Sequence, residues 1–329
     1  MGGSLDLADV LSAMRADLNI VEARLREEAN VDYPFIGEIL RGIIGGGGKR
    51  LRPLLLLLSA KPFNYVIDRL VPAAVGVELL HTASLIHDDT VDHAVLRRGR
   101  PTLNSLFSNE TVILIGDYVF ARSAMMAAAT MNPRVVTVFA SSLADICDGQ
   151  LREIFTAHQL TESIDDYRRR IFGKTAALFA GSAEMGAILG GADDAQIKAL
   201  NAFGGHVGMA FQIVDDVLDL RQSTDEIGKP AGLDLRQGTV TLPTMLFFRD
   251  HADNGHSDLV RRVIGGDEAT DDDYHEATIA IRQSGAIDHS LEIAGTYVAA
   301  AKEALRALPP GEPRDMLECM ADLSLQRTS

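Results

Sequence analysis

Hydrophobic residues recur every three to four positions along almost the whole chain. Near the start, Leu7, Val10, Leu11 and Met14 follow this spacing, which places them on one face of an amphipathic helix within residues 1–30. Ser4 precedes them and is a candidate N-cap. The same spacing predicts further helices at about residues 72–93, 111–130, 134–157, 164–189, 194–220, 241–251 and 287–308.

Glycine and proline residues gather between the predicted helices. Strict alternation of apolar and polar residues is scarce, so no sheet is predicted. The acidic stretch at residues 250–273 is the least ordered by composition. None of the breaks has the composition of a flexible linker, so we expect a single domain over residues 1–329. The breaks lie at residues 45–48, 98–101, 132–133, 228–238 and 309–313.

Composition narrows the possible functions. Hydrophobic residues make up 47% of the 329 positions and charged residues 23%, which suffices for a buried core. The net charge of -15 argues against a broad basic face for nucleic acid or anionic lipid. The two cysteines, Cys147 and Cys319, form neither a disulfide framework nor a Cys-rich zinc site. No apolar run approaches the ~18 to 20 residues that a membrane-spanning helix needs and no signal peptide is indicated, so a cytoplasmic location is expected.

One acidic pattern occurs twice, as DDTVD at residues 88–92 and as DDVLD at residues 215–219. In a helix, the first and last Asp of each copy lie one turn apart on one face. Such a carboxylate patch is mildly unfavourable without a cation, but it suits Mg²⁺, which binds one or two carboxylates together with phosphate oxygens and water. The alternative is a solvated acidic face. Two copies, each within an apolar helix, favour the metal hypothesis.

Basic residues stand beside these motifs in an otherwise acidic protein. The segment GGKRLRP at residues 47–53 combines a glycine-rich turn with three cations and could hold a phosphate at a helix start. It is not a Walker A loop, because Ile43 stands where that motif requires glycine and Arg50 follows the lysine. Nucleotide binding is therefore disfavoured. Further cations lie in LRRG at 96–99, GKT at 173–175 and GKP at 228–230.

Together these segments resemble the trans-isoprenyl diphosphate synthases, also called the polyprenyl synthetase family. The resemblance rests on six separated motifs in the family's order and covers about residues 35–245. The matching segments are GGKRLRP (47–53), ELLHTASLIHDDTVD (78–92), LRRG (96–99), GKT (173–175), FQIVDDVLD (211–219) and GKP (228–230).

The resemblance implies an all-α fold, a single large helical bundle around a deep central cavity, and usually a homodimer. It also implies a reaction in which isopentenyl diphosphate is joined to an allylic diphosphate through ionisation, attack by the alkene and loss of a proton. Fixed cations and up to about three Mg²⁺ ions would neutralise the departing diphosphate. The two acidic motifs would then face one another across the cavity.

By similarity, each motif residue receives a role. The metal ligands would be Asp88, Asp92 and Asp215, supported by Asp89, Asp216 and Asp219. The allylic diphosphate would be held by Arg97, Lys174 and Lys229. Isopentenyl diphosphate would be held by Lys49, Arg52, His81 and Arg98. Thr175 and Gln212 would place oxygen dipoles near the allylic cation, and released diphosphate would accept the proton.

Two further positions bear on the substrates. His81 alone is compatible with an ordinary core histidine, but it lies seven residues before Asp88 on nearly the same helix face. The sequence departs from the family at Thr239, where many relatives carry a lysine before the Thr-Leu-Pro seen here at residues 241–243. This difference removes one possible phosphate contact.

Product length depends on the apolar path beneath the metals. Ser84 lies one turn before Asp88, with Ala83 beside it, where short-chain relatives carry large aromatic residues. Small residues leave the path open, so the chain is similar to the long-chain type and a product of C20 or longer is expected. Phe120, Met125 or Met126 could still close the path.

Four other functions remain as alternatives. A short-chain synthase making a farnesyl or geranylgeranyl product is the nearest. A terpene cyclase usually has a different second metal motif and an aromatic pocket, whereas only 5% of residues are aromatic here. A silent subunit of a heteromeric synthase would generally have lost an acidic motif, and both are intact. A non-enzymatic acidic helical scaffold would not bind diphosphate with Mg²⁺.

Overall fold

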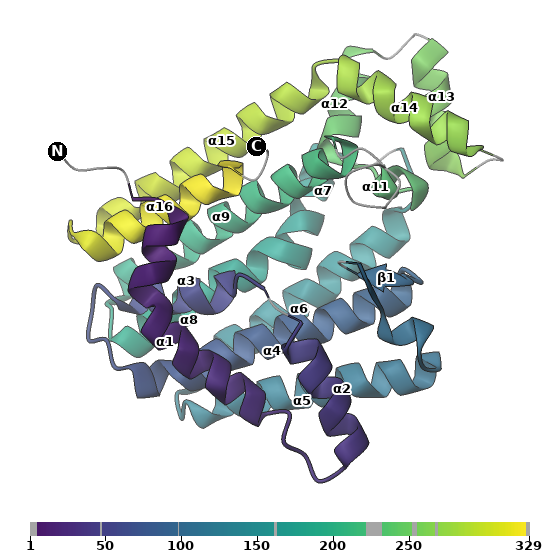
Figure 1. The fold of residues 1–329 in the computed structure, drawn as a ribbon. Coiled ribbons are helices and arrows are strands. Elements are labelled where there is room, and N and C mark those ends of the chain that lie inside the picture. Colours follow the sequence, from purple (N-terminus) through teal and green to yellow (C-terminus); the bar gives the residue numbers. More distant parts are fainter. Residues whose placement is uncertain are drawn as a thin grey trace. The chain divides into compact units, whose positions relative to one another are not determined.

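The computed structural model is almost entirely helical, as the hydrophobic spacing predicts (Figure 1). It describes residues 5–46, 48–97, 99–160, 163–221, 232–251, 255–266 and 269–326. The chain divides into two compact units. Unit 1 comprises Met1–Leu143, Leu178–Gly204 and Leu305–Cys319, and unit 2 comprises Ala144–Ala177, Gly205–Ala304 and Met320–Ser329.

Each helix predicted from the sequence is present, with shifted ends. The prediction placed a start at Pro72, but that helix begins at Ile67 and contains the proline. The stretch 164–189 is interrupted by a π-helical turn, Phe172–Ala176, labelled η2. The corresponding elements are α1 Leu7–Glu27, α4 Ile67–Val91, α5 Asn109–Ala129, α6 Pro133–Thr156, α7 Ile164–Ile171, α8 Ala177–Gly190, α9 Asp194–Arg221, α12 Leu242–Asp250, α15 Ala286–Ala304 and the short η3 Leu305–Ala307.

Several elements were not predicted. One of them, α13, lies in the stretch expected to be irregular, where Val260, Val263 and Ile264 are buried on its inner face. A two-stranded antiparallel hairpin, β1 Leu96–Arg97 with β2 Arg100–Pro101, is the only sheet within the described residues. The remaining elements are α2 Pro34–Ile44, α3 Leu51–Ala60, η1 Leu103–Ser105, α11 Leu233–Arg236, α13 Gly255–Gly265, α14 Asp271–Gln283 and α16 Glu312–Gln326.

Unit 1 is built around α3, α4 and α5. The five leucines at positions 54–58 of α3 are fully buried, as expected for a helix that is apolar all round. α4 packs against α3 and α5, and a side chain at Gly76 would press on the backbone of α5 at Ser123. α1 begins at an Asp6 capping box rather than at Ser4, which lies outside the described residues.

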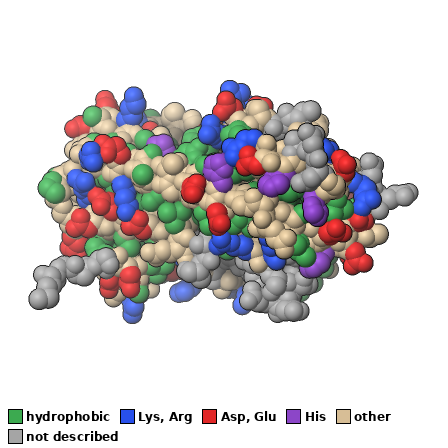
Figure 2. All heavy atoms as spheres, turned by 90° about the horizontal axis from the view of Figure 1, so that it is seen from above, with side chains coloured by type: hydrophobic (Ala, Val, Ile, Leu, Met, Phe, Trp, Pro, Cys, Tyr) green, Lys and Arg blue, Asp and Glu red, His purple; other side chains and the backbone are tan. Residues whose placement is uncertain are grey.

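Unit 2 has its own core around the second half of α9. Val214, Val217 and Leu220 of that helix are buried among side chains of α7, α12, α13, α14 and α15. In this way the helix that carries the second acidic motif is held on its apolar side by the core. On the face drawn in Figure 2, basic side chains lie among acidic ones rather than in one broad area.

Two helices are long and apolar enough to span a membrane, contrary to the expectation from the sequence. They are α4 and α5, and the apolar window of α4 is 67% buried while that of α5 is 39% buried. Core helices of soluble proteins meet the same criteria, so the match is weak evidence for a membrane span.

Candidate active site

The first acidic motif lies at the C-terminal end of α4 in unit 1. Asp88 is half-buried, Asp89 is buried and Asp92 is exposed as the C-cap of the helix. The carbonyl end of a helix carries a partial negative charge, so three carboxylates there create a strongly electronegative end. Such an end attracts a cation.

Asp89 is already paired with a cation from the β1–β2 hairpin. Arg97 Nε lies 2.7 Å from Asp89 Oδ1, and the two side chains are 38% and 12% exposed. Asn104 in η1 donates to the Asp89 carbonyl and accepts from the Thr90 hydroxyl at 2.9 Å. The hairpin therefore holds Arg97, predicted to bind the allylic diphosphate, directly beside the first motif.

The predicted isopentenyl diphosphate residues also belong to unit 1. Lys49 is exposed before α3, and the Arg52 guanidinium in the first turn of α3 lies 4.5 Å from the centre of the Phe179 ring. His81 is half-buried on α4. Arg50, between the two cations, points inward to Glu22 and Glu78. Gly47 and Arg98 lie outside the described residues.

The second acidic motif lies in the last two turns of α9, in unit 2. Asp215 and Asp219 are half-buried, and Asp216 is buried. Asp216 accepts hydrogen bonds from the Tyr167 hydroxyl at 2.7 Å and from Gln212 Nε2 at 2.8 Å. The middle carboxylate of this motif is thus held by neutral donors.

The charge state of Asp216 differs from that of an ordinary aspartate. Burial raises its pKa to about 7, although the hydrogen bonds from Gln212 and Tyr167 and the charge of Arg170 act in the opposite direction. Burial and the charge of Asp216 also raise the pKa of Tyr167. In the metal-free protein, this motif therefore carries less negative charge near neutral pH than its three carboxyl groups imply.

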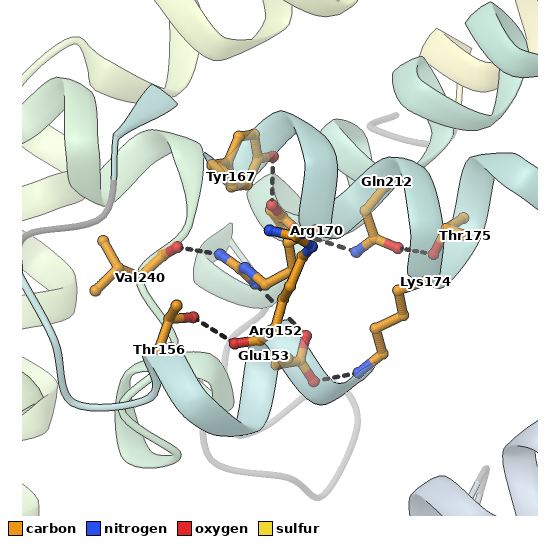
Figure 3. A network of polar contacts seen from close by, with 10 residues as sticks. Arg152, Glu153, Thr156, Tyr167, Arg170, Lys174, Thr175, Gln212 and Val240 are labelled. Carbon is orange, nitrogen blue, oxygen red and sulfur yellow. Dashed lines mark hydrogen bonds and ion pairs between the residues drawn. The ribbon is translucent and has the colours of Figure 1, made fainter. Parts of the chain in front are cut away.

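The predicted residues Lys174, Thr175 and Gln212 come together beside the second motif (Figure 3). The Thr175 hydroxyl donates to Gln212 Oε1 at 2.6 Å, and Lys174 Nζ pairs with Glu153 of α6. Lys174 and Thr175 belong to η2, and π-helical turns are frequent at functional sites. The turn displays the lysine toward α6 and the threonine toward α9.

Close backbone contact holds η2 in place. A Cβ at Gly149 of α6 would collide with the backbone of Lys174, and one at Gly173 would lie 2.6 Å from the Asp145 carbonyl. Arg170, at the end of α7, donates to the Val240 carbonyl at 2.6 Å and lies 3.5 Å from Glu153. Glu153 therefore faces two cations, of which Arg170 is buried.

Sequence reasoning missed Asp234. Asp219 caps the start of α11 by accepting from the backbone N–H groups of Leu233 and Asp234, each at 3.1 Å. Burial, followed by the charges of Asp219, Asp216 and Glu153, raises the pKa of Asp234 well above its usual value. Because Asp234 stands alone in the sequence, a search for closely spaced carboxylates does not find it. Lys229 lies outside the described residues.

The carboxylates of each motif do not form a preformed metal cage. Within the part of the chain that the structure describes, no group of three or more His, Cys, Asp or Glu side chains is arranged to hold a metal ion. Mg²⁺ usually binds one or two carboxylates and completes its shell with phosphate oxygens and water. The half-buried Asp88 and Asp215 suit that mode. The expectation that the two motifs face one another across a cavity stays a prediction.

Comparison with known proteins identifies the family. The polyprenyl synthetase family matches residues 33–281. A heptaprenyl diphosphate synthase component 2 of Geobacillus stearothermophilus is 37% identical over 319 residues, covering 96% of this chain and 98% of that one. The crystal structure of a polyprenyl synthase from Caulobacter crescentus, complexed with calcium and isoprenyl diphosphate, is 33% identical and has a TM-score of 0.93, with 100% of both chains covered. That of a decaprenyl diphosphate synthase from Rhodobacter capsulatus is 38% identical with a TM-score of 0.91, covering 97% of this chain and 98% of that one. With its two acidic motifs, the basic segments predicted to bind phosphate and its helical fold, this chain belongs to the polyprenyl synthetase family.

Proposed function

We propose that this protein is an Mg²⁺-dependent trans-prenyltransferase that condenses isopentenyl diphosphate with an allylic diphosphate to make a polyprenyl diphosphate of C20 or longer. The observation that carries the proposal is the pair of acidic motifs, in each of which the first and last Asp are partly exposed. Arg97 pairs with Asp89 of the first motif, and Lys174 precedes Thr175, which is hydrogen-bonded through Gln212 to Asp216 of the second. Relatives named as heptaprenyl and octaprenyl diphosphate synthases support it.

The allylic diphosphate must leave as an anion, so its binding groups carry the reaction. Bound Mg²⁺ would supply charge neutralisation at the diphosphate oxygens, and Asp88, Asp92 and Asp215 would hold it. Lys174 would exchange Glu153 for the diphosphate, while Arg170 keeps the charge of Glu153 balanced. Two solved structures similar to this chain, each complexed with calcium and isoprenyl diphosphate, support dependence on a divalent metal.

The allylic cation is the second charge that the site must stabilise. The cation forms when the C–O bond of the allylic diphosphate breaks and the electron pair leaves with the diphosphate. The alkene of isopentenyl diphosphate then forms the new C–C bond with the cation. The oxygens of Thr175 and Gln212 are linked to each other and, through the Gln212 amide, to Asp216. These hydrogen bonds fix the direction of the two dipoles before the cation forms. Released diphosphate then accepts the proton.

The decisive experiment measures the product of the purified chain. Isopentenyl diphosphate with a C5, C10, C15 or C20 primer and Mg²⁺ should give all-trans polyprenyl diphosphates, sized by mass spectrometry. Detergent in a parallel series keeps slow release of an apolar product from being mistaken for inactivity. Absence of any elongated product in all eight reactions would contradict the proposal.

Product length is expected to depend on Ser84. Its hydroxyl donates to the His81 carbonyl at 2.9 Å, and neighbouring Ala83 is fully buried, so both side chains are small and the Ser84 hydroxyl is turned back to its own helix. Ser84→Phe should shorten the product, whereas Ser84→Ala should leave it unchanged. Of the other candidates for closing the path, Met126 is buried and Met125 is 56% exposed. An identical product distribution for Ser84→Phe would remove the assignment of this path.

A second candidate function is that of one subunit in a heteromeric synthase. A relative named component 2 of a heptaprenyl diphosphate synthase favours it. Activity of the purified chain alone distinguishes the two, because a dependent subunit would elongate no primer without its partner.

We further propose a cytoplasmic homodimer, with residues 1–329 acting as one catalytic domain. The outer face of α5 supports the dimer, because Ile113, Leu114 and Met125 are 45%, 67% and 56% exposed. Leu114→Asp together with Met125→Asp should give a monomer by sedimentation, whereas Ile20→Asp on α1, 43% exposed in the native chain, should not. A dimer that survives the double substitution would place the interface elsewhere.

A further inference from the structure

Arg50 is surrounded by acceptors from three segments of unit 1. Its Nε lies 2.5 Å from Glu22 in α1, its Nη1 lies 2.7 Å from Glu78 in α4, and its Nη2 donates to the Ile44 carbonyl at 2.7 Å. The side chains of Arg50 and Glu78 are only 10% and 9% exposed. The middle cation of GGKRLRP is thus directed into the protein rather than toward a substrate.

The backbone of Arg50 has an unusual conformation. Its φ of 47° and ψ of 42° are left-handed, a conformation that residues with a Cβ seldom adopt unless their surroundings impose it. Arg50 is also the N-cap of α3, and the Leu54 N–H donates to its carbonyl at 2.9 Å. The reversal at Arg50 places exposed Lys49 before it and starts the helix whose first turn carries Arg52.

The ion cluster of Arg50, Glu22 and Glu78 also lies beside His81, the third predicted contact of isopentenyl diphosphate. Glu78 lies three residues before His81 on α4, so the two side chains share one side of the helix. The Thr82 hydroxyl donates to the Glu78 carbonyl at 2.8 Å in the same turn. One guanidinium therefore joins the turn that carries Lys49 to the helical turn that carries His81.

From this arrangement we infer that Arg50 is a positioning residue for isopentenyl diphosphate, which it does not touch: by joining Glu22 and Glu78 it sets the relative placement of Lys49, Arg52 and His81. The inference rests on the proposed function. It assigns to Arg50 an effect on one of the two substrates, whereas a purely structural ion cluster would affect both substrates or neither.

Charge balance supports the same role. Burial lowers the pKa of the Arg50 guanidinium, but the hydrogen bonds and charges of Glu22 and Glu78 outweigh it and raise the pKa overall. Without Arg50, two carboxylates would remain close together in a poorly solvated place, and one of them is in the same turn as His81. Either carboxylate could then attract Lys49 away from a diphosphate.

The test compares two Michaelis constants in a set of matched variants. Arg50→Met removes the guanidinium and keeps an unbranched side chain. Arg50→Lys keeps the positive charge but has a single nitrogen, which cannot bond all three acceptors of the guanidinium. The control is Arg122→Met on α5, which breaks another buried cluster of unit 1, where Arg122 Nε lies 2.8 Å from Glu28, itself 1% exposed. Each variant is checked for folding by circular dichroism and thermal unfolding.

For Arg50→Met we expect the KM for isopentenyl diphosphate to rise about tenfold, because a small displacement of binding groups has large effects. The KM for the allylic primer should stay within about twofold of the original. Arg50→Lys should fall between wild type and Arg50→Met, and Arg122→Met should leave the ratio of the two constants unchanged. A folded Arg50→Met variant with both constants unchanged, or both raised equally, would overturn the inference.

Glu22→Gln keeps the test decisive if Arg50→Met does not fold. Glu22 is 25% exposed, so its substitution is milder, and a rise confined to the KM of isopentenyl diphosphate is again expected. An unchanged constant in that variant would contradict the role of the cluster. If wild type elongates no primer, the proposed function fails, and calorimetric binding of isopentenyl diphosphate to wild type and Glu22→Gln then decides the inference separately, with equal affinities overturning it.

Discussion

The two acidic motifs have the same spacing but hold their middle carboxylates in opposite ways. Asp89 faces the guanidinium of Arg97 at 2.7 Å, in a place that is partly open to solvent. Asp216 is buried and faces the neutral donors Tyr167 and Gln212, and its pKa is raised to about 7. The first motif is therefore balanced by a charge, and the second is balanced partly by retaining a proton.

The comparison shows what a spacing pattern determines. A repeat of D-D-x-x-D fixes which carboxylates share a helix face, because that follows from helical geometry alone. It does not fix their charge, which depends on groups from other elements, here the β1–β2 hairpin for Asp89 and α7 for Asp216. Both motifs lie at the C-terminal end of a helix, where further negative charge is unfavourable. A metal ion bound at each motif would relieve both, and at the second it would compete with the proton on Asp216.

The first carboxylates of the two motifs, Asp88 and Asp215, should respond alike to substitution, and their loss should have the largest effect on turnover. Asp88→Ala and Asp215→Ala should each lower kcat by about two to three orders of magnitude, because each removes a proposed ligand of the Mg²⁺ that would neutralise the departing diphosphate. Steady-state kinetics at saturating Mg²⁺ measures this. Both side chains are only half-buried, so thermal unfolding without metal should change little.

The conservative changes Asp88→Glu and Asp215→Glu serve as controls and should retain more activity than the alanine variants. Unchanged turnover in both alanine variants would refute the metal assignment. A large loss in only one would show that the two motifs differ in function as well as in surroundings.

The middle carboxylates should respond differently to pH. The pKa of Asp216 is raised on folding, so this group destabilises the folded state increasingly as the pH rises from about 4 to about 7. Asp216→Asn removes that dependence. Between pH 5 and pH 8, without metal, wild type should lose about 2–3 kcal/mol more unfolding free energy than this variant does. Urea unfolding in the presence of a chelator measures the difference.

Asp89→Asn provides the matched control, because Asp89 faces a guanidinium instead of neutral donors. We expect it to lower the unfolding free energy similarly at both pH values, since it leaves Arg97 without its carboxylate partner. If Asp89→Asn and Asp216→Asn show the same pH dependence, the distinction between the two motifs is wrong.

The family, the all-helical fold and the class of enzyme were predictable from the sequence, because helical spacing and local motifs carry them. Both acidic motifs lie near helix ends, and Thr175 and Gln212, which are 37 residues apart, do form a hydrogen bond. The π-helical turn at Gly173 was not predictable, because it depends on close packing against Gly149 of another helix.

The other site residues were not predictable because their partners are distant in the sequence. Glu153 and Asp234 belong to no cluster of acidic residues in the sequence, and each is surrounded by groups from distant segments. Arg50 was grouped with the phosphate-binding cations since it stands between two of them. Its partners Glu22 and Glu78, each 28 residues away, direct it inward.

The smallest effect is expected from a substitution that gives the second motif a fixed cation, as the first motif already has. Thr239 stands where many relatives carry lysine, and its N–H donates to the Asp234 carbonyl at 2.8 Å, so its side chain starts close to the acidic group around Asp219. Thr239→Lys would supply a fixed cation there, as Arg97 does for Asp89. Because Thr239 is half-buried, the gain should be modest, a fall of about two- to threefold in the KM for the allylic primer.

Thr239→Met separates charge from size, because it lengthens the side chain without adding a cation. If charge is the cause, only the lysine variant should bind the allylic primer more tightly, and high salt should weaken the gain, since partly exposed charges are screened. The lysine should also favour the ionised form of nearby carboxyl groups, so the loss of stability between pH 5 and pH 8 should shrink. An equal fall in KM for both variants would instead attribute the effect to packing and leave the second motif dependent on its neutral donors alone.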